Sequence, residues 1–514
     1  MRANIVFALL VLMLGALVGG LVSRGQMPHA TAALGDQAPA IEGDASVSPT
    51  ASTSATALAP EPDDAREPRT EPTAAAAPPP IAPPLDRPLR VVASSWELAA
   101  PGVMANGGVF GGDDSLFSRA RLDVSLSASS DTTLVENALA RGGADPAGAD
   151  VIVVSLPRLV AASERLEVLD PRVFFVVGFA QGGHVLAGPT SLDDIDRDES
   201  VALAATPASP AALLGLFAFD VAGLTVELQS EAKGDGVWRA LDRRPSRADA
   251  TALEGRTVLT SAQASRLVPY VAVAREGFLR DHPAAAAALI EGWLEGRRMV
   301  DADPEGAARA IADTPDGPAM LTVLNDLRLV APVNLTSNAE LMGLAGRPAI
   351  TLSALTDRTL AWWSQAGVLT SSVRPTTPID HSVVALVARR HRALDDDGPP
   401  VDDEQASKTG SPSDTPNDTA EPLDVGDVIL VQRVRGKTLD REALTSAIAW
   451  LAGVFPEAAI EVSVHPGGVV DRDATSRALD HAAARFDIER RRLVEGAVTG
   501  RAGHVATIRV RSVR

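Results

Sequence analysis

The sequence predicts an α/β protein in which two lobes are joined end to end and followed by a small C-terminal α/β unit. Short runs of β-branched and apolar residues alternate with stretches of helical periodicity from residue 88 onward. The alternation restarts at Val201, beyond a glycine-rich stretch, which indicates a second lobe. A stretch rich in Pro, Ser, Thr and Asp then separates roughly the last 90 residues from the rest. Alternation of this kind predicts crossover helices packed on parallel sheets.

Bulk composition excludes several classes of function. A chain of 514 residues is too long for one ordinary core, so at least two folded units are expected. Its 66 acidic and 47 basic residues give a net charge of -19, which disfavours nucleic acid as a partner because the phosphate backbone would be repelled. Cysteine is absent, which excludes disulfides, thiolate catalysis and a lipidated cysteine. The histidines lack metal-ligand spacing, so neither a metal nor a cofactor is predicted.

The N-terminus carries an export signal. Arg2 precedes an uncharged apolar run at residues 5–22, and this order is what the secretion machinery recognises. A helix over this run would cover about 27 Å, so the run can remain in the membrane as an anchor. Cleavage after a small-x-small site at residues 30–32 is the alternative. We therefore interpret residues 1–24 as a signal anchor or signal peptide of a protein in the bacterial periplasm, anchored to the inner membrane if the run is retained.

Two stretches contain hardly any large apolar side chains and are predicted to be disordered linkers. They bound the two folded parts of the chain. The expected domains are a linker at 25–87, a bilobal domain at 88–394, a linker at 395–424 and a C-terminal unit at 425–514. Within the bilobal domain, lobe 1 is expected at about 88–185 plus a C-terminal return, and lobe 2 at about 195–330.

Individual elements follow from apolar runs and from start and stop signals. A helix at residues 132–141 follows the N-cap candidates Ser130 and Asp131 and ends at Gly142. In the first lobe, strands buried on both faces are expected at 89–93, 122–126, 151–154 and 173–177. In the second, strands are expected at 201–205, 224–228, 257–259 and 270–274, and helices at 209–219, 284–300, 305–312, 319–327 and 356–365.

Several motifs in this order resemble the type 2 periplasmic solute-binding proteins of the nitrate, taurine and sulfonate kind. The first lobe has LARGGAD at residues 139–145 and ADVIV at 149–153, similar to the family's helix that ends in Gly before an Asp-led strand. The second lobe has AATPASP at 204–210 entering a helix. The most specific match is REGFLRDHP at 275–283, followed by GWLEG at 292–296 and DPEGAA at 303–308. The resemblance covers about 300 residues and implies a bilobal fold that binds a small solute.

The C-terminal unit has a β-α-β-α-β pattern, with elements at 428–434, 441–454, 459–464, 474–485 and 505–510. This pattern resembles the OmpA-like domain, which in its family binds peptidoglycan through an Asp after the second strand and an Arg in the following helix. The matching positions here hold Gly467 and Ala483, or Arg477 if a small gap is allowed. Without the carboxylate, at least half of the charge-assisted contacts would be lost. The resemblance therefore implies a degenerate OmpA-like domain, for which a structural or protein-docking role is favoured over peptidoglycan binding.

Candidate ligand-binding residues lie in the loops after the predicted strands. Ligands of open α/β lobes lie at the C-terminal ends of strands, where helix N-termini expose free N–H groups. The loops there carry hydroxyls that can hydrogen-bond a ligand and an indole that can stack on it. For each of them a structural role as cap, turn or core residue is the alternative. The candidates are Ser94, Ser95, Trp96, Glu97, Ser155, Thr206, Ser209, Thr260 and Ser261.

Residues 178–184 are interpreted as the crossover between the lobes. They lack the Lys-Ser/Thr of a phosphate-binding loop. Their glycines Gly178, Gly182 and Gly183 would act as a hinge when the lobes close. Tyr270, the single tyrosine, is interpreted as a core residue more than as a ligand contact.

One departure from the resembled family affects the cleft. Residues 248–250 (ADA) match a second-lobe strand after which relatives continue into a long loop and helix that wall the cleft. Here only residues 251–256 precede the next strand, which predicts a pocket that is either shallower or lost.

The sequence favours a binding protein over an enzyme. It has no Gly-x-Ser-x-Gly nucleophile elbow and no paired carboxylates beyond surface runs. The leading hypothesis is a cell-envelope solute-binding protein that captures a small organic or oxyanionic ligand between its lobes for an ABC-type permease or sensor. The alternative is a non-transporting envelope scaffold that keeps the fold, has a degenerate cleft and docks to cell wall or protein through its C-terminal unit.

Overall fold

The computed structural model describes residues 85–513, with gaps at 193–194, 196–199, 232–236, 243–256, 316, 371–377, 397–422, 437, 467–468 and 498–502. The expected export signal, the first linker up to residue 84, most of the second linker and the shortened wall at 248–256 lie outside the described residues. Among the helices that are described, none is both long enough and apolar enough to cross a bilayer.

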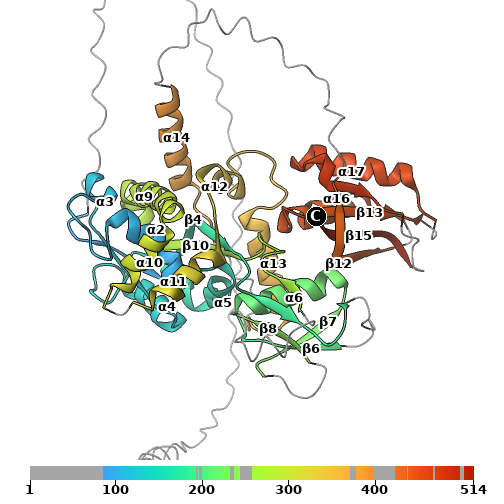
Figure 1. Cartoon of the computed structure of the whole chain (residues 1–514), viewed down its shortest axis with the longest axis horizontal. Coiled ribbons are helices and arrows are strands. Elements are labelled where there is room, and N and C mark those ends of the chain that lie inside the picture. Colours follow the sequence, from blue (N-terminus) through green and yellow to red (C-terminus); the bar gives the residue numbers. More distant parts are fainter. Residues whose placement is uncertain are drawn as a thin grey trace, which may run out of the picture. The chain divides into compact units, whose positions relative to one another are not determined.

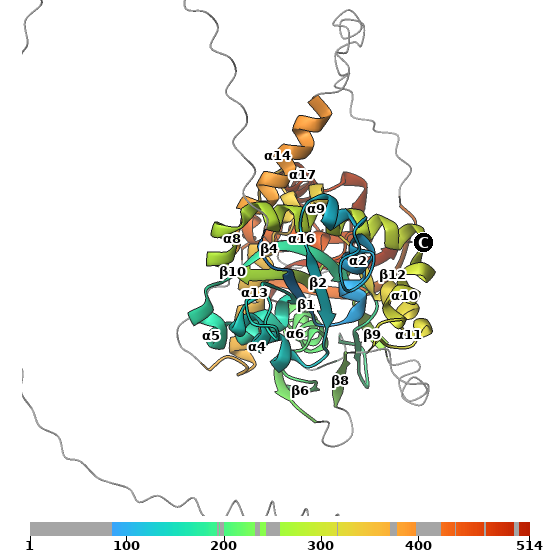
Figure 2. The same ribbon diagram turned by 90° about the vertical axis from the view of Figure 1, so that its left-hand side faces the viewer.

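The first lobe is built on a six-stranded mixed sheet. Its strands are β1 (Leu89–Ala93), β2 (Val124–Ala128), β3 (Val151–Ser155), β4 (Pro171–Ala180), β10 (Pro269–Arg275) and β11 (Val330–Pro332). They lie in the order β11-β4-β10-β3-β1-β2, and Figure 2 shows several of them edge to edge. β1 runs parallel to β2 and β3, whereas β10 runs antiparallel to β3 and β4. All five residues of β3 are buried, as expected for a central strand covered on both faces.

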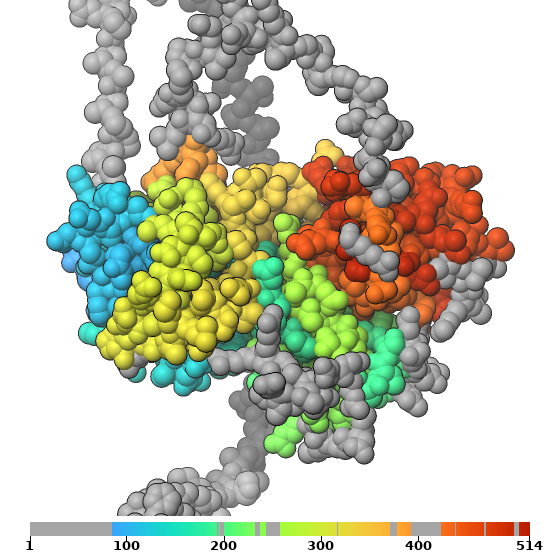
Figure 3. Space-filling model, in the orientation of Figure 1, coloured from blue at the N-terminus to red at the C-terminus, as the bar shows by residue number. Residues whose placement is uncertain are grey.

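The helices of the first lobe cover this sheet. They are α2 (Trp96–Asn106), α3 (Leu116–Arg119), α4 (Thr132–Arg141), α5 (Leu156–Leu166), α8 (Glu276–Asp281), α9 (Pro283–Ala302), α10 (Pro304–Ala312), α11 (Met320–Asp326), α12 (Leu335–Leu341), α13 (Leu352–Gln365) and α14 (Ser382–Asp396). α4 begins and ends as predicted, because Asp131 caps its first turn and Gly142 follows with a φ of 76°. Figure 1 shows α2 beside α9, and in Figure 3 the yellow-green residues of α9 lie beside the blue residues around α2.

α2 and α9 approach each other so closely that a glycine is needed at their contact. A Cβ atom on Gly296 of α9 would lie 1.9 Å from the carbonyl oxygen of Pro101 in α2. A Cβ on Gly292, one turn earlier, would lie 2.1 Å from the ring of Phe117. These two positions explain the glycines of the GWLEG motif as packing residues.

In its described residues, the second lobe contains a five-stranded sheet and the helix α6. Its elements are β5 (Val185–Ala187), β6 (Ser200–Ala204), α6 (Pro210–Ala222), β7 (Thr225–Gln229), β8 (Trp238–Leu241) and β9 (Thr257–Thr260). The strands lie in the order β7-β6-β8-β5-β9. Every residue of α6 except Asp220 is buried, so this helix is packed on all sides.

The lobe boundaries differ from the expected ones. β10 was expected in lobe 2 but inserts between β3 and β4 of the first sheet, and α9 packs on α2 of the first lobe. The described part of the second lobe therefore ends with β9 at Thr260, and not near residue 330. The reason is that an apolar strand carries the same pattern in either sheet, so the sequence does not say which sheet it joins.

The C-terminal unit is a separate four-stranded sheet with two long helices. Its elements are β12 (Val425–Arg435), α16 (Arg441–Val454), β13 (Ala459–Val464), α17 (Arg472–Phe486), β14 (Leu493–Glu495) and β15 (His504–Val513), in the strand order β12-β15-β13-β14. The five predicted elements are present, and β14 is an additional short strand parallel to β13.

The predicted class, a bilobal α/β domain followed by a small C-terminal α/β unit, is confirmed. The expected parallel pairing is present only in part, because each sheet is mixed. β10 enters the first sheet antiparallel to β3 and β4, β5 lies antiparallel to β8 and β9 in the second, and β15 lies antiparallel to β12 and β13 in the C-terminal unit.

Candidate functional site

The two lobes are joined by two chain crossings that are hydrogen-bonded to each other. Residues 181–184 lead from β4 to β5, and residues 261–268 lead from β9 back to β10. The backbone N–H of His184 donates to Oγ of Ser261 over 3.1 Å, and the N–H of Ser261 donates to the His184 carbonyl over 2.9 Å. The junction therefore places His184 at the base of both lobes.

The first-lobe wall of this junction contains an unusual hydroxyl. Ser155 ends β3 and is the N-cap residue of α5, but its side chain makes no capping bond. It is only 2% exposed, and its Oγ has no hydrogen-bond partner in the part of the chain that the structure describes. A buried polar atom without a partner costs free energy, so such an atom calls for an explanation.

The second-lobe wall is the N-terminus of α6. Ser209 caps this helix, because its Oγ accepts from the N–H of Ala212 over 3.1 Å. Asp242, directly after β8, accepts from the N–H of Ala211 over 3.0 Å. The carboxylate is thereby held at the positive end of the helix dipole.

A chain of polar side chains connects the two walls through His184. The hydroxyl of Tyr270 on β10 lies 3.5 Å from Nε2 of His184. On its other side, Nδ1 of His184 lies 3.5 Å from Oδ1 of Asp242, without hydrogen-bond geometry. The first lobe thus contributes Tyr270, the second contributes Asp242, and the crossing contributes the imidazole between them.

Burial determines the protonation states of Tyr270 and His184. Burial raises the pKa of Tyr270, and the carboxylates of Glu97 and Asp242 raise it further. Burial lowers the pKa of His184; Asp242 opposes this effect, and the positive charge of Arg158 adds to it. At neutral pH the phenol is therefore protonated and the imidazole neutral. A phenol with a raised pKa is a weak proton donor, and it stays protonated at neutral pH, so it is not available there to accept a proton.

Arg158 is the cation of the junction. It lies in the first turn of α5, three residues after Ser155, and its charge acts on both Tyr270 and His184. Within the described residues, its guanidinium forms no hydrogen bond and no ion pair. Among the described residues, the Arg158 guanidinium and the buried Ser155 hydroxyl are therefore donors without acceptors. This combination fits an oxyanion.

The predicted residues of the first lobe are brought to one edge of the sheet. Ser94 follows β1 and Ser155 ends the neighbouring parallel strand β3, and the N–H of Ser94 donates to the Val153 carbonyl. Ser95 is the N-cap residue of α2, again without a side-chain capping bond. Trp96 packs against the core of the lobe, and Glu97 in the first turn acts on the Tyr270 pKa.

The predicted residues of the second lobe and the crossing are mostly engaged in local structure. Ser209 caps α6, Ser261 accepts from His184, and Oγ1 of Thr260 pairs with Gln263 over 3.1 Å. Thr206 is exposed. These four are placed near the junction but, with the exception of the exposed Thr206, serve the roles of cap and turn.

The hinge glycines divide into two kinds. Gly182, with a φ of 78°, and Gly183 lie in the crossing, as expected. Gly178 instead lies inside β4, where a Cβ would come 2.6 Å from the Ala331 carbonyl oxygen. The hinge role expected for Gly178 is wrong, because this glycine allows β11 to approach.

Sequence reasoning missed Arg158, His184 and Asp242 as site residues and favoured a core position for Tyr270. Signals for the first three exist in the sequence. Arg158 follows Ser155 by one helical turn, His184 is the histidine of the interlobe crossing, and Asp242 directly follows a strand. Tyr270 is half-buried against the core and also faces the junction.

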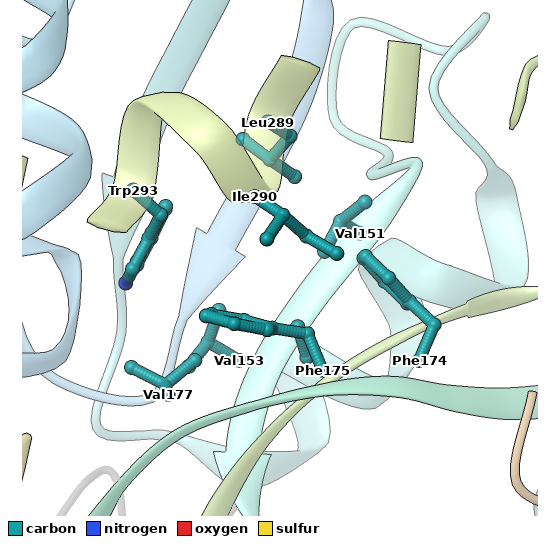
Figure 4. Close-up of a pocket in the computed structure, with 9 residues that line it drawn as sticks. Val151, Val153, Phe174, Phe175, Val177, Leu289, Ile290 and Trp293 are labelled. Carbon is teal, nitrogen blue, oxygen red and sulfur yellow. The ribbon is translucent and has the colours of Figure 1, made fainter. Parts of the chain in front are cut away.

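An internal cavity of the first lobe is not a ligand site. Figure 4 shows its side chains, which come from β3, β4, β10 and α9 and converge on a space between sheet and helix. The cavity holds about 10 Å³, roughly the space of one water molecule, and its lining side chains are apolar apart from the indole N–H of Trp293. The described residues also contain no group of three or more His, Cys, Asp or Glu that could hold a metal ion.

No protein-family model matches the chain, and no curated protein matches it. One solved structure of similar arrangement is the periplasmic aliphatic sulphonate binding protein SsuA from Escherichia coli, which is 14% identical in sequence. The match covers 57% of this chain and 92% of the SsuA chain, with a TM-score of 0.41. The periplasmic nitrate-binding protein NrtA from Synechocystis PCC 6803 is 13% identical, and the match covers 65% of this chain and 92% of the NrtA chain, with a TM-score of 0.36. A ligand-binding component of an ABC-type import system from Staphylococcus aureus is 9% identical, and the match covers 59% of this chain and 99% of that protein, with a TM-score of 0.38. Likeness at this level carries no information about ligand or activity.

Proposed function

We propose that the chain is a cell-envelope solute-binding protein that holds a small organic anion or oxyanion between its lobes and presents it to an ABC-type permease or a sensor. The observation that carries the proposal is the buried Ser155 hydroxyl, which has no partner among the described residues, three residues before Arg158, whose guanidinium has no ion pair there either. Both groups lie where the two lobes meet, and a bound oxyanion would satisfy both.

The site binds but does not convert its ligand. A reaction would need a nucleophile within hydrogen-bond reach of a base. At this junction the imidazole of His184 is 3.5 Å from both of its neighbours, and the Tyr270 phenol is protonated. Recognition through donors that are already in place, followed by lobe closure, fits this geometry better than catalysis.

The envelope location rests on the export signal at residues 5–22, which lies outside the described residues. The linker at 25–87 would hold the bilobal domain away from the bilayer surface if the signal is retained as an anchor.

The scaffold alternative is less favoured. A degenerate cleft has no reason to keep a buried hydroxyl without a partner, because its replacement by alanine would be neutral or stabilising. Peptidoglycan binding by the C-terminal unit is also less favoured. Gly467, at the position of the expected carboxylate, lies outside the described residues, and the nearby Asp471 accepts from the N–H of Ala474 as the N-cap of α17.

A thermal-shift panel on the whole chain tests the proposal. Nitrate, sulfate, phosphate and 1-propanesulfonate are each compared with the neutral analogue 1-propanol. A ligand present at 100 times its Kd stabilises the folded state by about 2.7 kcal/mol, which corresponds to a rise of several degrees. At least one anion is expected to raise the unfolding temperature while 1-propanol does not. A panel in which no anion produces a shift would count heavily against the proposal.

A further inference from the structure

A cluster of aromatic side chains joins the C-terminal unit to the bilobal domain. Both belong to the same compact part of the chain, residues 79–514. Trp362 of α13 meets Phe217 of α6 edge to face at 6.0 Å between ring centroids. Trp450 of α16 lies 6.3 Å from Trp362, and Phe455 lies 5.9 Å from Phe217. All four side chains are at most 5% exposed, so their apolar surfaces are removed from water by this contact.

An arginine strengthens the contact. The guanidinium of Arg358, one turn before Trp362 on α13, lies 4.1 Å from the centroid of the Trp450 ring. Burial lowers the pKa of Arg358, with the Asp220 carboxylate opposing this effect. A desolvated cation over an indole face is a strong form of cation–π contact, and Trp and Arg are typical anchor residues of interfaces.

The C-terminal unit also contacts the second interlobe crossing. The N–H of Arg266, in the crossing at 261–268, donates to the carbonyl of Val454 at the end of α16 over 3.2 Å. The same end of α16 is held by Arg492, which donates to the carbonyls of Ala452 and Phe455. Beside it, Gly453 allows close approach, because a Cβ there would lie 2.9 Å from Cβ of Ile350.

The contacted helices are connected to the interlobe site. The indole N–H of Trp363, next to Trp362 on α13, donates to the carbonyl of Pro157 over 2.9 Å. Pro157 lies in the first turn of α5, between Ser155 and Arg158. α6, the other contacted helix, has its N-terminus at Asp242. The C-terminal unit therefore touches a first-lobe helix, a second-lobe helix and the crossing between the lobes.

From these contacts we propose that the C-terminal unit is an intramolecular clamp that fixes the angle between the two lobes. A rotation of the second lobe about the crossings must move α6 relative to α13, and this movement would separate Phe217 from Trp362 and both from the C-terminal aromatics. Docking of the C-terminal unit and the interlobe angle are then linked, so that whatever releases the unit also frees the lobes. The inference goes beyond solute binding and does not depend on the identity of the ligand.

Distance measurements between the lobes test the clamp. Because the chain has no cysteine, spin labels on Val168→Cys in the first lobe and Thr225→Cys in the second would be the only ones present. Both positions are exposed. The docked chain is expected to give one narrow distance distribution by pulsed electron paramagnetic resonance.

The variant Gly453→Gln is designed to separate the C-terminal unit from the bilobal domain. It places a side chain against Ile350, while glutamine is a better helix former than glycine and so preserves α16. Gly277→Gln is the matched control, because a Cβ at this helical glycine would meet only the end of Arg280 at 3.6 Å. We expect Gly453→Gln, alone or together with Trp450→Glu, to broaden or shift the interlobe distribution, with circular dichroism showing retained helix content. Gly277→Gln should leave the distribution unchanged. If the distribution stays narrow and unshifted in both α16 variants, the clamp is overturned.

Discussion

Tyr270 lies opposite Ser155 across the antiparallel pair formed by β10 and β3, so the two side chains project from the same face of the first sheet. The pairing brings a residue of the returning strand β10 beside the start of α5. From there the Tyr270 hydroxyl reaches His184, which in turn approaches Asp242 of the second lobe. The interlobe site is thus assembled from three segments that are far apart in the sequence.

Ser155→Ala should weaken anion binding without destabilising the protein. The Ser155 hydroxyl has no partner in the described part of the chain, so its removal costs no existing hydrogen bond and relieves a buried unsatisfied group. The loss of one hydrogen bond to a bound anion should reduce affinity about tenfold, roughly 1.4 kcal/mol. Titration calorimetry and thermal unfolding measure the two effects separately.

Ser163→Ala is the control for this substitution. Ser163 lies in the same helix and is also buried, but its hydroxyl donates to the Val160 carbonyl over 2.6 Å. We expect a stability loss of about 1 kcal/mol and an unchanged affinity. Equal effects of the two alanine substitutions on affinity would contradict the special role of Ser155.

Arg158→Gln should reduce the affinity for anions by one to two orders of magnitude. A charge-assisted hydrogen bond contributes about 1.5–3 kcal/mol, and the guanidinium has no carboxylate partner among the described residues that would compete for it. Arg165→Gln, in the same helix, removes an exposed ion pair with Glu136 and should change affinity little. A similar loss in both variants, measured by calorimetry, would point to a general charge effect instead of a contact.

Stability should fall as the pH drops below about 6.5, and His184 should account for part of that fall. The pKa of His184 is lowered in the folded state, mainly by burial. Below the unfolded-state pKa of about 6.5, the unfolded chain binds a proton that the folded chain does not bind. The stability that neutral His184 contributes is therefore present above that pH and is lost as the pH falls towards the folded pKa, with a slope of at most about 1.4 kcal/mol per pH unit.

The measurement compares the unfolding midpoint between pH 7.5 and 5.0 for wild type, His184→Gln and His391→Gln. His391 is exposed on α14 and serves as control. The pH dependence should become shallower in His184→Gln alone. Asp242, Arg158 and Tyr270 surround the imidazole, so a dependence unaltered by His184→Gln would assign the proton uptake to other groups.

Gly296→Ala should destabilise the first lobe by about 2–4 kcal/mol, because the added methyl group overlaps the Pro101 carbonyl oxygen and forces α9 away from α2. Gly277→Ala, in the open space of α8, should instead be neutral or stabilising by up to about 1 kcal/mol. Thermal unfolding of the two variants gives the comparison. Equal stabilities would show that α2 and α9 are not packed this closely.

Much of the fold follows from local signals. β1 has the predicted bounds of 89–93, and α4 has both its cap and its terminal glycine where the sequence places them. β2 begins two residues later than predicted, at Val124, because Leu122 is buried outside the sheet, in the turn after α3. The assignment of β10 to a lobe failed for a different reason. Its apolar residues fit either sheet, and only the path of the whole chain decides between them.

The candidate site was partly predictable. Ser155 was predicted as a ligand contact because the residue after a buried strand faces the ligand edge of an α/β sheet, and this role stays a prediction. Arg158 was missed because an arginine in an amphipathic helix has the pattern of a surface residue. His184 and Asp242 were missed because they become candidates only through their mutual approach. They lie 58 positions apart in the sequence (242 minus 184), and local sequence patterns do not predict a contact over that separation.

The central claim is that an anion binds between the lobes, at Ser155 and Arg158. Hydrogen exchange of the whole chain, with and without the anion that gives the largest thermal shift, tests it most directly. We predict slower exchange in the starts of α2 and α5, in the crossing at 181–184 and around Asp242 together, and loss of this protection in Arg158→Gln. Protection that appears only elsewhere, for example around residues 466–473 of the C-terminal unit, would contradict it.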